Sequence, residues 1–265
     1  MDFERITVAL SSDIPQVARI TLSRPDLRNA FDDVAIAELT HAFTLAGQAP
    51  AVRAIILDAE GPAFCAGADL NWMKRMAGYS DAENRADALA LATMLNTLYT
   101  CPKPVVAQVQ GDAYAGGMGL VAACDIVVAA DEVQFCLSEA RLGLIPATIA
   151  PYVIRAMGEK AARRYFVTAE RFGAKKALML GMAHEVTTAG ALVETVNSIA
   201  RAIAANSPNA VKECKRLVMD LAGRPIDAAL MTDTAERIAQ IRASAEGREG
   251  VSSFLEKRKP TWLAQ

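Results

Sequence analysis

Two glycine-rich segments, about fifty residues apart, carry residue types that could stabilise a negatively charged oxygen. They are residues 64–70 (Phe-Cys-Ala-Gly-Ala-Asp-Leu) and residues 111–120 (Gly-Asp-Ala-Tyr-Ala-Gly-Gly-Met-Gly-Leu). Each follows a short apolar run that predicts a buried strand, at 54–57 and 105–109, and each leads into a predicted helix. The first N–H groups of a helix have no intrahelical partner and lie at its positive end, so two such turns facing one another would bind an oxygen anion. The pattern therefore indicates chemistry on a carbonyl compound through an enolate.

A single glutamate that follows the second segment, Glu139, could transfer the proton in such a reaction. A glutamate in a loop is more often a helix cap or a surface carboxylate, so its position alone leaves both interpretations open. The other candidate groups lack partners, because His41 and His184 are isolated and no histidine pairs with Cys65 in the sequence. Neither the cysteines nor the histidines have metal-ligand spacing, so we expect no metal site.

The elements that would position these residues alternate between strands and helices over most of the chain. Apolar periodicity predicts strands at 6–10, 17–22, 126–130 and 134–136, and helices at 32–45 and 82–99. Such repeated units favour an α/β core with its site at the strand-to-helix turns. Later in the chain the pattern changes to successive amphipathic helices, at 191–205, 208–221 and 225–243. We therefore expect a core domain, residues 1–190, and a C-terminal helical section, residues 191–265, that packs on another subunit.

Four segments in order resemble the crotonase superfamily, the enoyl-CoA hydratases and isomerases. Residues 24–31 (Arg-Pro-Asp-Leu-Arg-Asn-Ala-Phe) are similar to the family's Arg-Pro-x-x-x-Asn-Ala segment, and the two glycine segments follow. Residues 249–260 are similar to its closing Glu-Gly-x-x-x-Phe-x-x-Lys-Arg run. The resemblance implies a crotonase-like ββα spiral core and a homotrimer or dimer of trimers. Within the family, residues 71–74 and 135–146 look most like bacterial 3-methylglutaconyl-CoA hydratases of leucine breakdown.

The resemblance also assigns roles to individual residues. The family motifs place the two oxyanion-hole N–H groups at Ala68 and Gly116, and the proton-transferring carboxylate at Glu139. CoA is part of the substrate, so no separate cofactor is expected. The residues expected to contact CoA are Leu27, Arg28, Ala66, Asp69, Leu70 and Lys257.

One position departs from the family pattern. Well-studied hydratases of the family carry a second glutamate where this chain has Gly119, and the two carboxylates together hold the water that adds to the double bond. Three interpretations follow: Glu139 acts alone, the substrate's own distal carboxylate takes part or occupies the vacated room, or the enzyme shifts a double bond. A distal carboxylate would need a cation, for which the candidates are Lys74, Arg75, Arg85 and Arg155.

The sequence thus predicts a hydratase that adds water to a 2-enoyl-CoA thioester, with 3-methylglutaconyl-CoA as the expected substrate. The alternatives are an enoyl-CoA double-bond isomerase, a hydratase for the longer branched isohexenylglutaconyl-CoA, and a catalytically weak CoA-binding protein that kept the fold. The loss of a carboxylate at Gly119 supports the last alternative, whereas Glu139 and both glycine segments count against it.

Composition narrows the partners and the compartment. The 265 residues include 28 Lys and Arg against 30 Asp and Glu, with no basic patch of the kind that nucleic acid requires. No apolar run approaches a membrane span, and the N-terminus has neither the basic start nor the apolar core of a signal peptide. Five scattered cysteines without pairing spacing are typical of a reducing compartment. We therefore expect a cytoplasmic protein without nucleic-acid or membrane partners.

Overall fold

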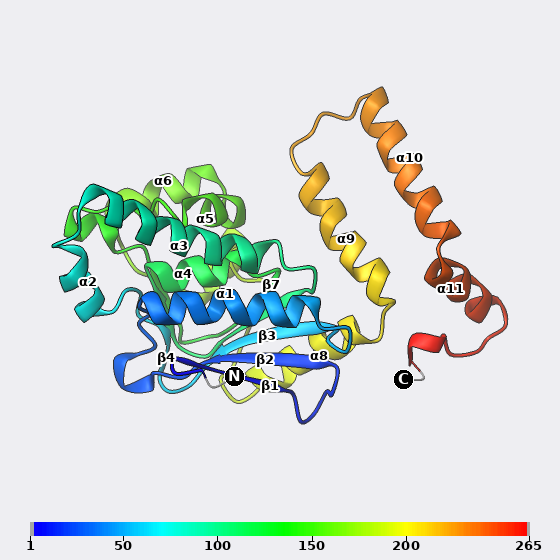
Figure 1. Cartoon of the computed structure of the whole chain (residues 1–265), viewed down its shortest axis with the longest axis horizontal. Coiled ribbons are helices and arrows are strands. Elements are labelled where there is room, and N and C mark those ends of the chain that lie inside the picture. The colour runs from blue at the N-terminus through cyan, green and yellow to red at the C-terminus, as the bar shows by residue number, and fades with distance from the viewer. Residues whose placement is uncertain (1–2, 264–265) are drawn as a thin grey trace.

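The computed structural model describes residues 3–263 and contains a six-stranded sheet covered on both faces (Figure 1). Its strands run in the order β1-β2-β3-β5-β7-β10, and every neighbouring pair except the antiparallel β1–β2 is parallel. The inner strands β3 and β5 are apolar almost throughout because both of their faces are buried. The bounds are β1 Ile6–Leu10, β2 Val17–Leu22, β3 Ala54–Ala59, β5 Val105–Val109, β7 Ile126–Ala130 and β10 Glu185–Thr187.

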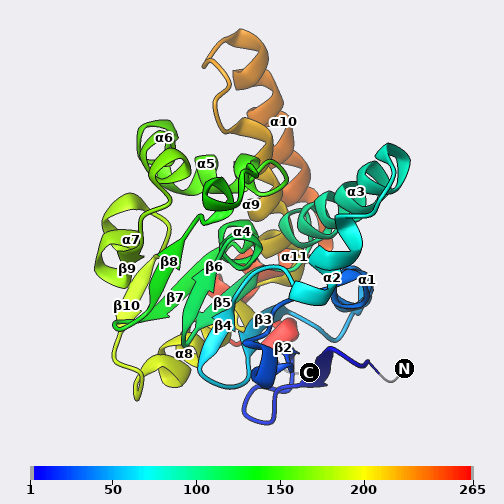
Figure 2. The same cartoon turned by 90° about the vertical axis from the view of Figure 1, so that its left-hand side faces the viewer.

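A second, four-stranded sheet is built from much shorter strands, in the order β4-β6-β8-β9 (Figure 2). The pairs β4–β6 and β6–β8 are parallel, and β8–β9 is antiparallel. Each of its first three strands lies a few residues downstream of a strand of the large sheet, so the chain passes repeatedly from one sheet to the other. The bounds are β4 Ala63–Cys65, β6 Asp112–Tyr114, β8 Gln134–Cys136 and β9 Phe172–Gly173.

Helices α1 and α3 pack against each other above the large sheet, and α8 packs against its opposite face (Figure 1). Asp32 caps α1 by accepting from the Ala35 N–H, and Ser80 and Glu83 form a reciprocal capping box at the start of α3. The helices of this part are α1 Asp33–Gln48, α2 Leu70–Met76, α3 Asp81–Tyr99, α4 Gly116–Ala123, α5 Ala150–Met157, α6 Glu159–Thr168 and α7 Ala174–Leu180, with single 3₁₀ turns at η1 Pro25–Leu27 and η2 Glu139–Leu142.

The C-terminal helices divide into one that joins the core and three that leave it. Helix α8 (Leu192–Ala204) buries its apolar side against β3, β5 and β7. Helices α9 (Pro208–Leu221), α10 (Ala228–Ala243) and α11 (Ala245–Leu255) extend away from the sheets (Figure 1). The turn η3 (Thr261–Leu263) follows them and returns to the start of β3, where Arg53 donates to the Trp262 carbonyl at 3.5 Å. An ion pair between Lys215 and Asp125, 2.7 Å apart, joins α9 to the core. The boundary expected near residue 190 and the subunit contacts of residues 191–265 stay predictions, and the outermost residues of both ranges lie outside the described part.

Candidate active site

The two glycine-rich segments lie side by side in the second sheet. Strand β4 pairs with β6 in parallel, with Cys65 opposite Ala113, so the turns that follow the two strands meet. At the meeting point Gly67 has a left-handed backbone, with φ of 96°. A Cβ on Gly67 would lie 3.1 Å from the Cβ of Ala115 and 3.8 Å from the amide nitrogen of Gly116. The approach of the two turns therefore requires glycine at this position.

Each turn presents unused backbone donors, and the family motifs select one residue on each, Ala68 and Gly116. The neighbours of Ala68 are fixed, because Phe31 donates to the Gly67 carbonyl at 2.9 Å and Asp69 donates to the Phe31 carbonyl at 3.0 Å. Gly116 is the first residue of α4, where an N–H has no intrahelical partner. Across residues 3–263, neither the Ala68 N–H nor the Gly116 N–H donates a hydrogen bond. Two free donors on adjacent turns are the arrangement that an oxyanion hole requires.

Glu139 reaches the same region through strand β8. The Ala115 N–H donates to the Cys136 carbonyl at 2.8 Å, so the chain that leads to Glu139 is attached directly beside Gly116. Glu139 begins the turn η2, and its Oε2 atom is buried without a hydrogen-bond partner among the described residues. Burial raises the pKa of this carboxyl above its ordinary value, and a hydrogen bond from its own backbone lowers it by less. A partly buried carboxylate with an unused oxygen can accept and return a proton.

The position of the missing second carboxylate is already filled. A Cβ on Gly119 would lie 2.2 Å from Cγ2 of Ile149 and 2.7 Å from its Cβ, and Ile149 is itself fully buried. The interpretation that a distal carboxylate of the substrate occupies vacated room at Gly119 is therefore wrong, because Ile149 packs directly against that residue. Sequence reasoning missed Ile149, since the two positions are thirty residues apart and only the fold brings them together.

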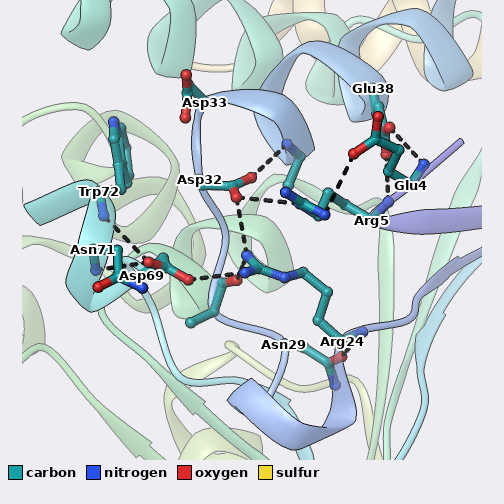
Figure 3. Close-up of polar contacts among 12 residues, drawn as sticks. Glu4, Arg5, Arg24, Asn29, Asp32, Asp33, Glu38, Asp69, Asn71 and Trp72 are labelled. Carbon is teal, nitrogen blue, oxygen red and sulfur yellow. Dashed lines mark hydrogen bonds and ion pairs between the residues drawn. The ribbon is translucent and has the colours of Figure 1, made fainter. Parts of the chain in front are cut away.

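Asp69, one of the residues expected to contact CoA, is committed to internal contacts (Figure 3). Its carboxylate caps α2 through the Asn71 and Trp72 N–H groups and pairs with Arg24 at 2.9 Å. Burial acts to raise the pKa of Asp69, but the Trp72 and Asn71 N–H groups and Arg24 outweigh it and hold the pKa below its ordinary value. Arg24 also pairs with Asp32, the cap of α1, at 3.2 Å. This network fixes the turn on which Ala68 lies, and its role was not visible in the sequence beyond the presence of Arg24 in a family motif.

The other residues expected to contact CoA separate into two groups. Three of them are exposed, Leu27, Arg28 and Leu70, and Ala66 is half-buried. The Ala66 N–H donates to the Arg28 carbonyl at 2.9 Å, which joins these two residues. Lys257 follows α11, which lies at the other end of the molecule from α2 (Figure 1). Within one chain the fold therefore gathers all of these residues except Lys257 around the first glycine segment.

None of the four cations considered for a distal carboxylate forms an ion pair or hydrogen bond with Glu139 in the described part of the chain. Lys74 and Arg85 are exposed, and Arg75 pairs with Asp33. Arg155 lines a cavity of about 560 Å³ beneath α9, and the described lining of this cavity does not include Glu139. Within residues 3–263 no His, Cys, Asp and Glu side chains are grouped to hold a metal ion, and no helix is long and apolar enough to cross a bilayer.

Comparison with known proteins agrees with this architecture. The family model for enoyl-CoA hydratase/isomerase matches residues 14–265. The solved structure of an enoyl-CoA hydratase from Shewanella pealeana is 42% identical, with a TM-score of 0.94, and the match covers 98% of this chain and 96% of that one. Enoyl-CoA hydratase AKT6-1 of Alternaria alternata is 33% identical over 91% of this chain and 79% of its own length. The mitochondrial enoyl-CoA hydratase domain-containing protein 3 of Danio rerio is 30% identical over 99% of this chain and 90% of its own.

The two sheets, the C-terminal helices and the match in space define an α/β enzyme of the crotonase fold, as the sequence predicted. Within that class, the chain belongs to the enoyl-CoA hydratase/isomerase family, whose hydro-lyase members act on CoA thioesters.

Proposed function

We propose that the protein adds water to a 2-enoyl-CoA thioester, with 3-methylglutaconyl-CoA of leucine breakdown as substrate, and that Glu139 is its only proton-transferring residue. The observation that carries this proposal is the Oε2 atom of Glu139, which is buried and has no hydrogen-bond partner among the described residues. Glu139 follows Cys136 in the chain, and the Cys136 carbonyl accepts from the Ala115 N–H, next to the free Gly116 N–H. The filled space at Gly119 supports the same conclusion, because no second carboxylate fits there.

In the proposed reaction the thioester oxygen accepts hydrogen bonds from the Ala68 and Gly116 N–H groups. Glu139 takes a proton from water while the water oxygen bonds to C3, and the electrons of the C2–C3 double bond move onto the thioester oxygen to form an enolate. Glu139 then returns the same proton to C2 as the enolate collapses. Because one group handles both steps, the hydroxyl and the proton add to the same face of the double bond.

We also propose the remaining features of the assignment on the family resemblance. CoA lies along Leu27, Arg28 and Ala66, with Lys257 supplied by a neighbouring copy in a homotrimer or dimer of trimers, and the protein works in the cytoplasm. Large apolar side chains lie exposed on the extended helices and in the loop between α9 and α10, and they support an assembly because exposed apolar patches are typical of protein contact sites. They are Val218, Ile226, Met231, Ile238, Val251, Phe254 and Leu255.

The test is the ultraviolet band of the conjugated enoyl thioester, followed with 3-methylglutaconyl-CoA, crotonyl-CoA and a 3-enoyl-CoA. Rapid loss of the band with the first substrate alone is the expected result. A gain of the band from the 3-enoyl-CoA, without hydration of either 2-enoyl thioester, would assign the protein as an isomerase, for which one proton-carrying base suffices. Hydration of isohexenylglutaconyl-CoA in preference to 3-methylglutaconyl-CoA would assign the longer branched thioester as the substrate. No change of the band with any of the four thioesters would favour a CoA-binding protein.

A further inference from the structure

Phe31 contacts both of the turns that carry the free N–H groups. Its backbone forms a parallel β-bridge with Ala68: the Phe31 N–H donates to the Gly67 carbonyl, and the Asp69 N–H donates to the Phe31 carbonyl. Its ring lies against Gly116: a Cβ there would be 2.3 Å from Cζ and 2.9 Å from Cε1 of Phe31. The main chain of Phe31 thus fixes one donor and its ring touches the residue that carries the other.

The surroundings of Phe31 hold it in place on both sides along the chain. The buried side-chain amide of Asn29 donates to the carbonyls of Glu60 and Ala63, at 2.8 Å each. On the other side Asp32 caps α1 and pairs with Arg24 (Figure 3). Phe31 itself is 2% exposed, and its ring centroid lies 6.1 Å from that of Trp72. A ring packed in this way has little freedom to move away from Gly116.

We propose that Phe31 is the positioning residue that sets the separation between the Ala68 and Gly116 N–H groups. This inference rests on the proposed function, since it takes these two groups as the oxyanion donors. Oxyanion donors must lie about 2.7–3.1 Å from the charged oxygen, so a shift of one turn against the other weakens one of the two bonds. The ring acts as a spacer: with a shorter side chain, the first turn of α4 is no longer held at its distance from Ala68.

The test compares Phe31→Leu with Phe43→Leu. Phe43 is a fully buried phenylalanine of α1 that has no part in the proposed site, so both variants lose an aromatic ring from the core. We expect Phe31→Leu to lower kcat by roughly 10- to 100-fold with little change in KM, the scale of a misplaced reacting group, and Phe43→Leu to leave kcat unchanged. The second readout is the ultraviolet enolate band of bound acetoacetyl-CoA, which reports donor placement without turnover. This band should weaken in Phe31→Leu only.

A second pair of variants separates spacing from a general loss of packing. Gly116→Ala places a methyl group against the ring, and we expect it to lower kcat by at least 10²-fold, the typical effect of losing one oxyanion donor. Phe31→Leu lacks the ring atoms that conflict with this methyl group, so the double variant should regain part of both kcat and the enolate band. A substitution that harms the wild type but helps Gly116→Ala is expected only if the ring sets the spacing.

Equal behaviour of Phe31→Leu and Phe43→Leu, with an active wild type, would overturn the role of Phe31 and leave the proposed function intact. A wild type that neither hydrates an enoyl-CoA nor shows an enolate band would overturn the proposed function, and this inference with it.

Discussion

Placing a glutamate at Gly119, where related hydratases carry their second carboxylate, should inactivate this protein rather than improve it. The new Cβ would begin 2.2 Å from Cγ2 of Ile149, so one of the two backbones must move by about an ångström before ordinary contact is restored. Overpacking of this kind typically costs about 1–3 kcal/mol. A carboxylate at a buried position without a partner adds several kcal/mol more. The sum is a large part of the roughly 5–15 kcal/mol that stabilises an average domain.

The assay is thermal unfolding together with hydration rate, for Gly119→Ala, Gly119→Glu and the control Gly190→Ala. A Cβ on Gly190 meets nothing within 4 Å, so that variant should match the wild type. Gly119→Ala should lower the melting temperature by roughly 2–4 °C for each kcal/mol lost, and Gly119→Glu by more, with loss of hydration. A Gly119→Glu protein that melts like the wild type and hydrates faster would refute the packing argument.

Three further predictions follow from the charges and the exposed surface. Because burial raises the pKa of Glu139, its carboxyl binds protons more tightly in the folded protein than in the unfolded one. The free energy of unfolding should therefore fall as the pH rises from the ordinary glutamate pKa through the raised pKa. At neutral pH the Glu139→Gln variant should have a higher melting temperature than the wild type and should lose activity. Arg24→Met leaves the buried Asp69 carboxylate without its cation, and Asp32 with Arg5 alone. In denaturant unfolding it should cost about 3–5 kcal/mol, with partial rescue by Arg24→Lys; an unchanged midpoint would contradict the network. Phe254→Glu on α11 should lower the mass measured by light scattering, whereas Val167→Glu on α6, which is exposed to a similar degree, should not. Equal masses for the two variants would remove α11 from the contact.

The architecture could be predicted from the sequence wherever burial leaves a periodic signal. The apolar run at 54–57 and the largely apolar run at 105–109 form β3 and β5, because strands covered on both faces carry no regular polar alternation. The second sheet as a whole was not foreseen, since β4 and β9 have only three and two residues and show no period. Helix α10 begins at Ala228 rather than at 225, because the Asp227 side chain provides the cap.

The candidate site could be predicted only as far as neighbouring residues define it. The strand–turn–helix spacing in the sequence predicted the two glycine turns, with Glu139 after the second. The fold brings the two turns together, and the catalytic roles of these residues stay predictions. The contact of Ile149 with Gly119 and of the Phe31 ring with Gly116 joins residues far apart in the sequence. Such contacts depend on the volume left between packed elements, and a single sequence does not report that volume.

The most direct test of the account is the hydration rate of Glu139→Gln with 3-methylglutaconyl-CoA, measured beside the wild type and with acetoacetyl-CoA binding as a control for the intact site. We predict that hydration falls by at least 10²-fold while the enolate band of bound acetoacetyl-CoA persists, because the Ala68 and Gly116 donors are untouched. Turnover at the wild-type rate would contradict it, since another group would then have to carry the proton.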